Sequence, residues 1–102
     1  MTLKLRFSPG AAADYRTIYR EYEKARPGLE DEFRFLFRKI AVRILNYPQS
    51  SPVIYRGARR LLLGKFPFHL YYRVHGKTLK VVAILPARQD PKASRKRIRR
   101  EH

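Results

Sequence analysis

The 102-residue chain carries 24 Lys and Arg residues against 8 Asp and Glu residues, which gives a formal net charge of +16 at pH 7. A single domain is expected at this length, and 44% hydrophobic and 13% aromatic residues are enough for a packed core, so the charge alone does not predict disorder. Because cysteine is absent and no apolar run reaches the length of a signal peptide or a membrane span, we expect a cytoplasmic protein without a membrane partner.

The charge is unevenly distributed along the chain. Residues 1–32 hold six basic and six acidic side chains, whereas residues 33–102 hold eighteen basic ones against only Asp90 and Glu101. Such a field attracts polyanions and acidic proteins, so we expect nucleic acid or an acidic protein as a partner. The alternative is a solvated surface that keeps the protein soluble, although a mixture of signs usually serves that purpose.

The first elements are a strand and a helix. Leu3 to Phe7 alternates apolar and basic residues, which is typical of a strand with one covered face. Ser8 and Pro9 then supply an N-cap acceptor and a residue suited to the first helical turn, so a helix begins there. Its apolar side chains share one stripe: Ala11, Tyr15, Ile18, Tyr19 and Tyr22.

A second helix is predicted from about residue 29 to residue 46. Residues 26–28 interrupt the first periodicity, and Glu30, Asp31 and Glu32 favour the N-terminal end of a new helix dipole. Its apolar positions repeat the helical spacing: Leu29, Phe33, Leu36, Phe37, Ile40 and Ile44. Because the link is short, the two helices must form an antiparallel hairpin.

The second half predicts antiparallel strands. After a loop over residues 47–52, strands are expected over 59–63, 66–74 and 78–85, with Gly76 in a tight hairpin between the last two. Phe68, Leu70, Tyr72 and Val74 share one face of the middle strand, with His69, Tyr71 and Arg73 on the other. The last strand is predicted to be buried on both faces and central in the sheet.

The predicted fold class is therefore α+β, with an N-terminal strand and a helical hairpin packed on a small antiparallel sheet. Residues 1–91 form the predicted domain. Residues 92–102 form a basic tail with almost nothing to bury, so we expect a frayed helix or disorder there.

Several kinds of chemistry lack the residues they require. His69, His75 and His102 have no metal-ligand spacing and there is no cysteine, so we expect no metal. The phosphate-binding loop of ATP-using proteins and the serine-hydrolase elbow are also missing, and we expect no cofactor.

What remains is a set of basic side chains on the predicted strands and their loops. They are Arg56, Arg59, Arg60, Lys65, His69, Arg73 and Arg88. Such groups can hold phosphates, and a metal-independent ribonuclease can use one to deprotonate a 2′-hydroxyl and others to stabilise the transition state. The alternative is an exposed polar sheet face without chemistry. Tyr71 and Tyr72 are interpreted as packing residues rather than base-stacking platforms.

The order of elements and four local motifs resemble the RelE/ParE superfamily of toxins from toxin–antitoxin systems, over about residues 3–91. The motifs are Phe7-Ser8-Pro9 through Asp14, Leu45-Asn46-Tyr47-Pro48, the run from Arg60 to Val74, and the run from Val82 to Pro91. The resemblance implies a growth-arresting toxin that is neutralised by a cognate antitoxin whose flexible, acidic segment wraps it. It does not indicate which residues bind the antitoxin.

The superfamily has two branches, one that cuts messenger RNA on the ribosome and one that inhibits DNA gyrase. RNA-cutting members similar to this chain commonly have an arginine where His69 stands and an aromatic residue near the C-terminus, whereas no aromatic residue follows Tyr72 here. We therefore favour gyrase inhibition. In the ribonuclease alternative, Arg88 and Lys65 clamp phosphate and His69 or a lysine acts as the base. A non-toxic nucleic-acid-binding module is the second alternative.

Overall fold

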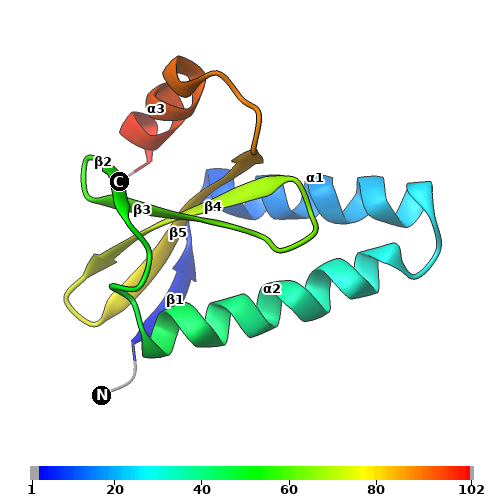
Figure 1. Cartoon of the computed structure of the whole chain (residues 1–102), viewed down its shortest axis with the longest axis horizontal. Helices are drawn as coiled ribbons and strands as arrows, with labels where there is room; N and C mark the ends of the chain where they lie inside the picture. The colour runs from blue at the N-terminus through cyan, green and yellow to red at the C-terminus, as the bar shows by residue number, and fades with distance from the viewer. Residues whose placement is uncertain (1–2, 102) are drawn as a thin grey trace.

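A computed structural model describes residues 3–101 (Figure 1). The elements in chain order are β1 (Lys4–Phe7), α1 (Pro9–Ala25), α2 (Leu29–Asn46), β2 (Val53–Tyr55), β3 (Ala58–Leu62), β4 (Phe68–His75), β5 (Thr78–Pro86) and α3 (Pro91–Arg100). The outer ends of the predicted domain and tail, residues 1, 2 and 102, lie outside the described residues. The predicted α+β fold class is confirmed.

Local hydrogen bonds mark the start of both helices of the hairpin. The Ser8 hydroxyl oxygen accepts a hydrogen bond from the Ala11 N–H at 3.0 Å and donates one to the Val82 carbonyl at 3.2 Å. Gly28 precedes α2 with φ of +94°, a left-handed conformation that favours glycine, and its N–H donates to Glu30 Oε1 at 2.6 Å. Local sequence signals therefore set the ends of the hairpin, as predicted.

The five strands form one sheet in the order β1-β5-β4-β3-β2. The three predicted strands of the second half, β3, β4 and β5, pair antiparallel, but β1 pairs parallel with β5, with Leu5 opposite Leu79. The expectation of a wholly antiparallel sheet is therefore wrong for the N-terminal strand, because residue alternation identifies a strand without indicating its neighbour or direction. The prediction also missed β2, a three-residue strand next to β3 at the far edge.

The sheet buries side chains on both faces. Leu70 and Tyr72 of β4 pack with the hairpin in a larger cluster, while Tyr71 belongs to a second cluster on the opposite face. Strand β5 contributes to both clusters, as predicted. In the pairing with β4, Ala83 lies opposite Tyr71 and Val81 lies opposite Tyr72. Val82 of β5 is therefore an extra residue, and the strand bulges there.

The second cluster is covered by α3, which lies at the top of Figure 1, away from α2. Asp90 caps this helix by accepting from the Lys92 N–H at 3.0 Å. Ile98 is 1% exposed and Ser94 is 7% exposed. The prediction that this segment has almost nothing to bury is therefore wrong, because one apolar side chain among basic ones is enough to anchor the helix on the sheet.

Candidate functional site

The molecule presents two contrasting surfaces. We call the exposed side of α3 together with the adjoining sheet the basic face. Its arginines are Arg56, Arg60, Arg73, Arg95 and Arg99. We call the hollow between α1, α2 and β1 the apolar groove.

Tyr55 lies among three arginines of the basic face. Its hydroxyl oxygen accepts hydrogen bonds from Arg56 Nε and Arg99 Nη1, each at 3.1 Å, and the Arg56 and Arg95 guanidinium carbons each lie 5.5 Å from its ring centroid. The hydrogen bond from Arg99, followed by that from Arg56, lowers the pKa of Tyr55. A neutral ring rather than a carboxylate holds these arginines together, so their positive charge stays uncompensated.

Arg73, a predicted phosphate-binding residue, instead holds the end of α3. Its Nη1 donates to the Glu101 carbonyl at 2.6 Å and its Nη2 to the Ile98 carbonyl at 3.4 Å, while Nε donates to the Arg56 carbonyl at 2.9 Å. Burial, and then the charge of Arg56, lowers the pKa of Arg73. Carbonyl groups at a helix C-terminus favour a cation, so this arrangement stabilises α3 on the sheet.

The other predicted site residues do not share one place. Arg59 Nη1 donates to the Ser51 carbonyl at 2.6 Å, and Lys65 forms an ion pair with Glu32 of α2. Arg88 is exposed in the turn between β5 and α3, with no hydrogen bond to another described residue. The structure therefore does not gather Arg88, His69 and Lys65 into one pocket.

Arg60 and His69 do come together, in a cleft of about 210 Å³ between the sheet and α3. This cleft also exposes Arg95 of α3 and the Gln89 side chain of the preceding turn. Burial, and then the charge of Arg60, lowers the pKa of His69, so its imidazole is neutral at pH 7. The sequence analysis placed both residues in its basic set without indicating that they would be neighbours.

A partly buried ion pair connects α1 with α3. Asp14 of α1 accepts from Arg97 of α3 at 3.2 and 2.7 Å, and its Oδ2 also accepts from the Ile84 N–H at 3.0 Å. The hydrogen bonds to Asp14 raise the pKa of Arg97, although burial acts in the opposite direction. Asp14 therefore joins α1, β5 and α3.

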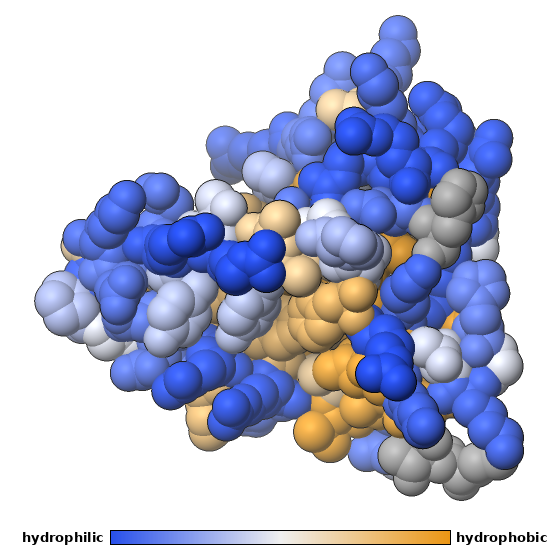
Figure 2. Space-filling model, turned by 180° about the vertical axis from the view of Figure 1, so that it is seen from behind, coloured by the Kyte–Doolittle hydropathy of each residue, from blue (hydrophilic) through white to orange (hydrophobic). Residues whose placement is uncertain are grey.

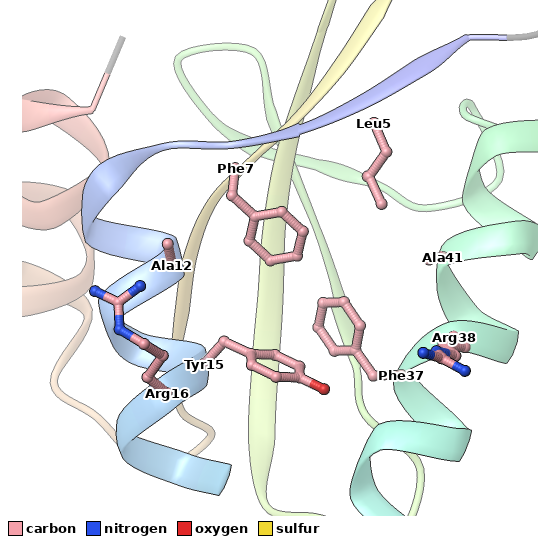
Figure 3. A pocket seen from close by; sticks show the side chains of 8 residues that line it. All are labelled: Leu5, Phe7, Ala12, Tyr15, Arg16, Phe37, Arg38 and Ala41. Atoms are coloured by element: carbon pink, nitrogen blue, oxygen red, sulfur yellow. The ribbon is translucent and has the colours of Figure 1, made fainter.

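The apolar groove has a volume of about 460 Å³. Its lining comprises Leu5, Phe7, Ala12, Tyr15, Arg16, Phe37, Arg38 and Ala41. Figure 2 shows hydrophobic side chains gathered in this hollow and surrounded by hydrophilic ones. In Figure 3 the rings of Phe7, Tyr15 and Phe37 converge in the groove, while Arg16 and Arg38 stand on opposite sides of it.

Strand β1 forms one wall of the groove and is also an edge strand, since β5 is its only neighbour in the sheet. Its free side presents backbone groups that can pair with a strand of another chain. The groove and this edge together offer apolar surface, backbone hydrogen-bonding groups and two flanking positive charges.

Sequence reasoning missed the groove. The helical stripes that contain Tyr15 and Phe37 do pack toward the core, where Phe37 is 5% exposed and Tyr15 is partly buried. The stripes gave no sign that the outer sides of these two rings stay uncovered. The available signal is the alanine pair Ala12 and Ala41, which leaves space beside the aromatic rings where two larger side chains would have closed the hollow.

Comparison with known proteins identifies the family. Residues 5–91 match the family model described as the ParE toxin of the type II toxin–antitoxin system parDE. The chain belongs to the ParE toxin family. A type II toxin of this kind is paired with an antitoxin, so membership implies an antitoxin partner. The matched range includes the hairpin, all five strands except Lys4, and the apolar groove, and it ends where α3 begins.

A solved structure shows the same fold. A chain of the structure titled "Chromosomal ParDE TA system from P. aeruginosa" superposes with a TM-score of 0.61 at 24% sequence identity. The similarity covers 83% of this chain and 96% of that one. No curated protein matches the sequence significantly.

Within residues 3–101, no helix has the length and apolar character needed to cross a bilayer, and no three His, Asp or Glu side chains cluster as metal ligands would.

Proposed function

We propose that this ParE-family chain arrests bacterial growth by inhibiting DNA gyrase. The observation that carries the proposal is the family match over residues 5–91, which spans the hairpin and all of the sheet except Lys4. The scattered positions of Arg88, His69 and Lys65 give less support to messenger RNA cleavage, since that reaction requires a base and phosphate-binding groups in one place.

The apolar groove is the proposed binding site of the antitoxin. A hollow lined by Phe7, Tyr15 and Phe37 fits the apolar side chains of an amphipathic segment, and Arg16 and Arg38 at its sides fit acidic residues of the same segment. The net charge of +16 favours an acidic partner and speeds its encounter with the toxin.

A supercoiling assay with purified gyrase tests the proposal. The purified chain should block supercoiling at toxin concentrations comparable to that of gyrase, and adding the antitoxin encoded by an adjacent reading frame should restore it. A poly-arginine peptide of equal charge is the matched control, because a strongly cationic protein can aggregate DNA without touching the enzyme. Normal supercoiling at micromolar toxin would contradict gyrase inhibition.

Induction of the chain in bacteria separates the remaining functions. Growth arrest with intact messages agrees with the proposal. Codon-phased messenger cuts that disappear in Arg88→Ala would instead establish a ribosome-dependent endoribonuclease. Full viability together with salt-sensitive binding to nucleic acid would indicate a non-toxic nucleic-acid-binding module.

A further inference from the structure

We propose that the cleft beneath α3 binds one nucleotide unit, with its base inside the cleft and its phosphate at the mouth. The inference concerns the basic face rather than the apolar groove, and it stands apart from gyrase inhibition. Three features of the cleft carry it: an unpartnered amide, two unpaired guanidinium groups and aromatic walls.

The unpartnered amide belongs to Gln89. Its Oε1 is buried and has no hydrogen-bond partner, and it is the only such side-chain atom within residues 3–101. Proteins avoid burying an acceptor without a donor, because the lost hydration destabilises the fold. Because Gln89 also lines the cleft, a rotation of its side chain would turn this oxygen toward a ligand that brings an N–H group into the cleft. The exocyclic amino group or ring N–H of a nucleobase is such a donor.

The positive charges belong to Arg60 of β3 and Arg95 of α3. Both side chains line the cleft, and neither forms an ion pair or a hydrogen bond with another described residue. The guanidinium carbon of Arg95 lies 5.5 Å from the centroid of the Tyr55 ring. Planar guanidinium groups bind phosphate oxygens in pairs of hydrogen bonds, so two unpaired arginines that line the same cleft are suited to hold a phosphate there.

The walls and the size of the cleft fit one flat ring. Tyr55, Tyr71, Ile54 and Ile98 supply aromatic and apolar surface. The neutral imidazole of His69, which meets the Tyr71 ring edge-on at 6.3 Å between centroids, offers one further donor or acceptor. The cleft volume of about 210 Å³ is below the roughly 300–1,000 Å³ of sites that enclose drug-sized ligands. A cleft of this size admits one ring but not a base pair. The bound base must therefore be unpaired, which excludes a base stacked in a duplex.

The test is NMR titration of the isotope-labelled full chain with nucleoside 5′-monophosphates. Saturable shifts should appear at the Gln89 side-chain amide and the His69 ring. Inorganic phosphate alone should move Arg60 and Arg95 but leave the Gln89 amide unchanged, and it should bind at least about tenfold more weakly, since it lacks the contacts of the base. Equal affinity for phosphate and nucleotides, or unmoved Gln89 and His69 signals at millimolar nucleotide, would overturn the proposal.

Two variants and one control assign the contacts. Gln89→Leu should weaken nucleotide binding by about tenfold or more while raising the melting temperature, because it removes the buried unpaired amide. Arg60→Gln should weaken both nucleotide and phosphate binding. Lys24→Gln removes an equal charge from an exposed position on α1 and should leave nucleotide affinity unchanged. A nucleotide affinity that Gln89→Leu leaves unaltered would contradict a base in the cleft.

A second set of titrations, with single-stranded hexanucleotides, distinguishes a nucleic-acid strand from free nucleotides as the source of the bound unit. Single-stranded hexanucleotides should bind more tightly than mononucleotides if the cleft serves a strand, since further phosphates reach Arg56 and Arg99 on the basic face. Equal affinity would assign the site to free nucleotides. Both results support the nucleotide site, and either is compatible with success or failure of the gyrase assay.

Discussion

The two faces of the sheet are completed in opposite ways. On the hairpin side, aromatic rings of α1, α2 and β1 remain open to solvent in the apolar groove, while several charges are paired, as in Lys65 with Glu32. On the other side, α3 covers the apolar surface, while Arg60 and Arg95 remain unpaired. The apolar groove therefore lacks an apolar cover, and on the other side Arg60 and Arg95 lack anionic partners among the described residues.

This difference indicates which kind of partner each face can bind. Exposed apolar surface beside an edge strand is stabilised by another polypeptide, whereas unpaired arginines around a small polar cleft are stabilised by phosphate. The net charge of the chain alone could not separate these two roles, because it describes the whole molecule rather than either face.

The largest expected loss of stability is at Ile98, the buried side chain that anchors α3 and with it the basic face. Ile98→Ala should lower the free energy of unfolding by about 3 kcal/mol, because it leaves a cavity under α3 where the side chain is 1% exposed. Chemical denaturation measures the loss, and amide exchange should rise first in α3. The exposed Val42→Ala is the matched control and should change stability by less than about 0.5 kcal/mol. An equal loss in both variants would show that α3 is not anchored as described.

A smaller effect is expected where the two faces are joined. Asp14→Ala should destabilise the fold by about 2 kcal/mol, because it leaves Arg97 and the Ile84 N–H without their partner in a site that is only partly exposed. Thermal unfolding measures the change. Asp31→Ala, which breaks an exposed ion pair with Arg34, should cost less than about 1 kcal/mol. Asp14 would not be the connecting residue if the two variants lost the same stability.

The third prediction concerns the sides of the apolar groove. Arg16→Gln combined with Arg38→Gln should weaken antitoxin binding by roughly tenfold, because two charges beside the bound segment are lost. Calorimetry at several salt concentrations measures the affinity, and its salt dependence should also decrease. Lys24→Gln combined with Lys92→Gln removes the same charge outside the groove and should have little effect. Equal weakening would indicate that net charge alone attracts the antitoxin.

The smallest predicted effect is a pH dependence from His69. Because the pKa of His69 is lowered in the folded state, the unfolded chain binds the proton more readily, and stability falls as pH decreases through about 6.5. His69→Gln should lose less stability than the parent between pH 7.5 and 5.5. An NMR titration should place the imidazole pKa below its ordinary value, and Arg60→Gln should raise it. An unshifted pKa would contradict the burial of His69 in the cleft.

The sequence predicted the parts of the fold that depend on neighbouring residues. The stripe from Ala11 to Tyr22, the Ser8 cap and the break at Gly28 are local signals, and the structure confirms the hairpin. The alternation in β4 correctly separated Leu70 and Tyr72 from Tyr71.

What could not be predicted depends on long-range packing. The burial of Ile98 requires the outer surface of β4 and β5, and the parallel pairing of β1 depends on how the hairpin returns the chain. For the same reason, the seven predicted basic site residues did not form one site. Lys65 lies in the turn between β3 and β4 and pairs with Glu32 of α2, whereas His69 of β4 lines the cleft under α3.

Hydrogen exchange of the toxin with and without its antitoxin tests the contrast between the two faces most directly. We predict that binding protects β1 and the groove-facing turns of α1 and α2 around Tyr15 and Phe37, and leaves α3 unchanged. Protection confined to α3 and the basic face, with exchange in β1 unaltered, would contradict the assignment of the apolar groove to the antitoxin.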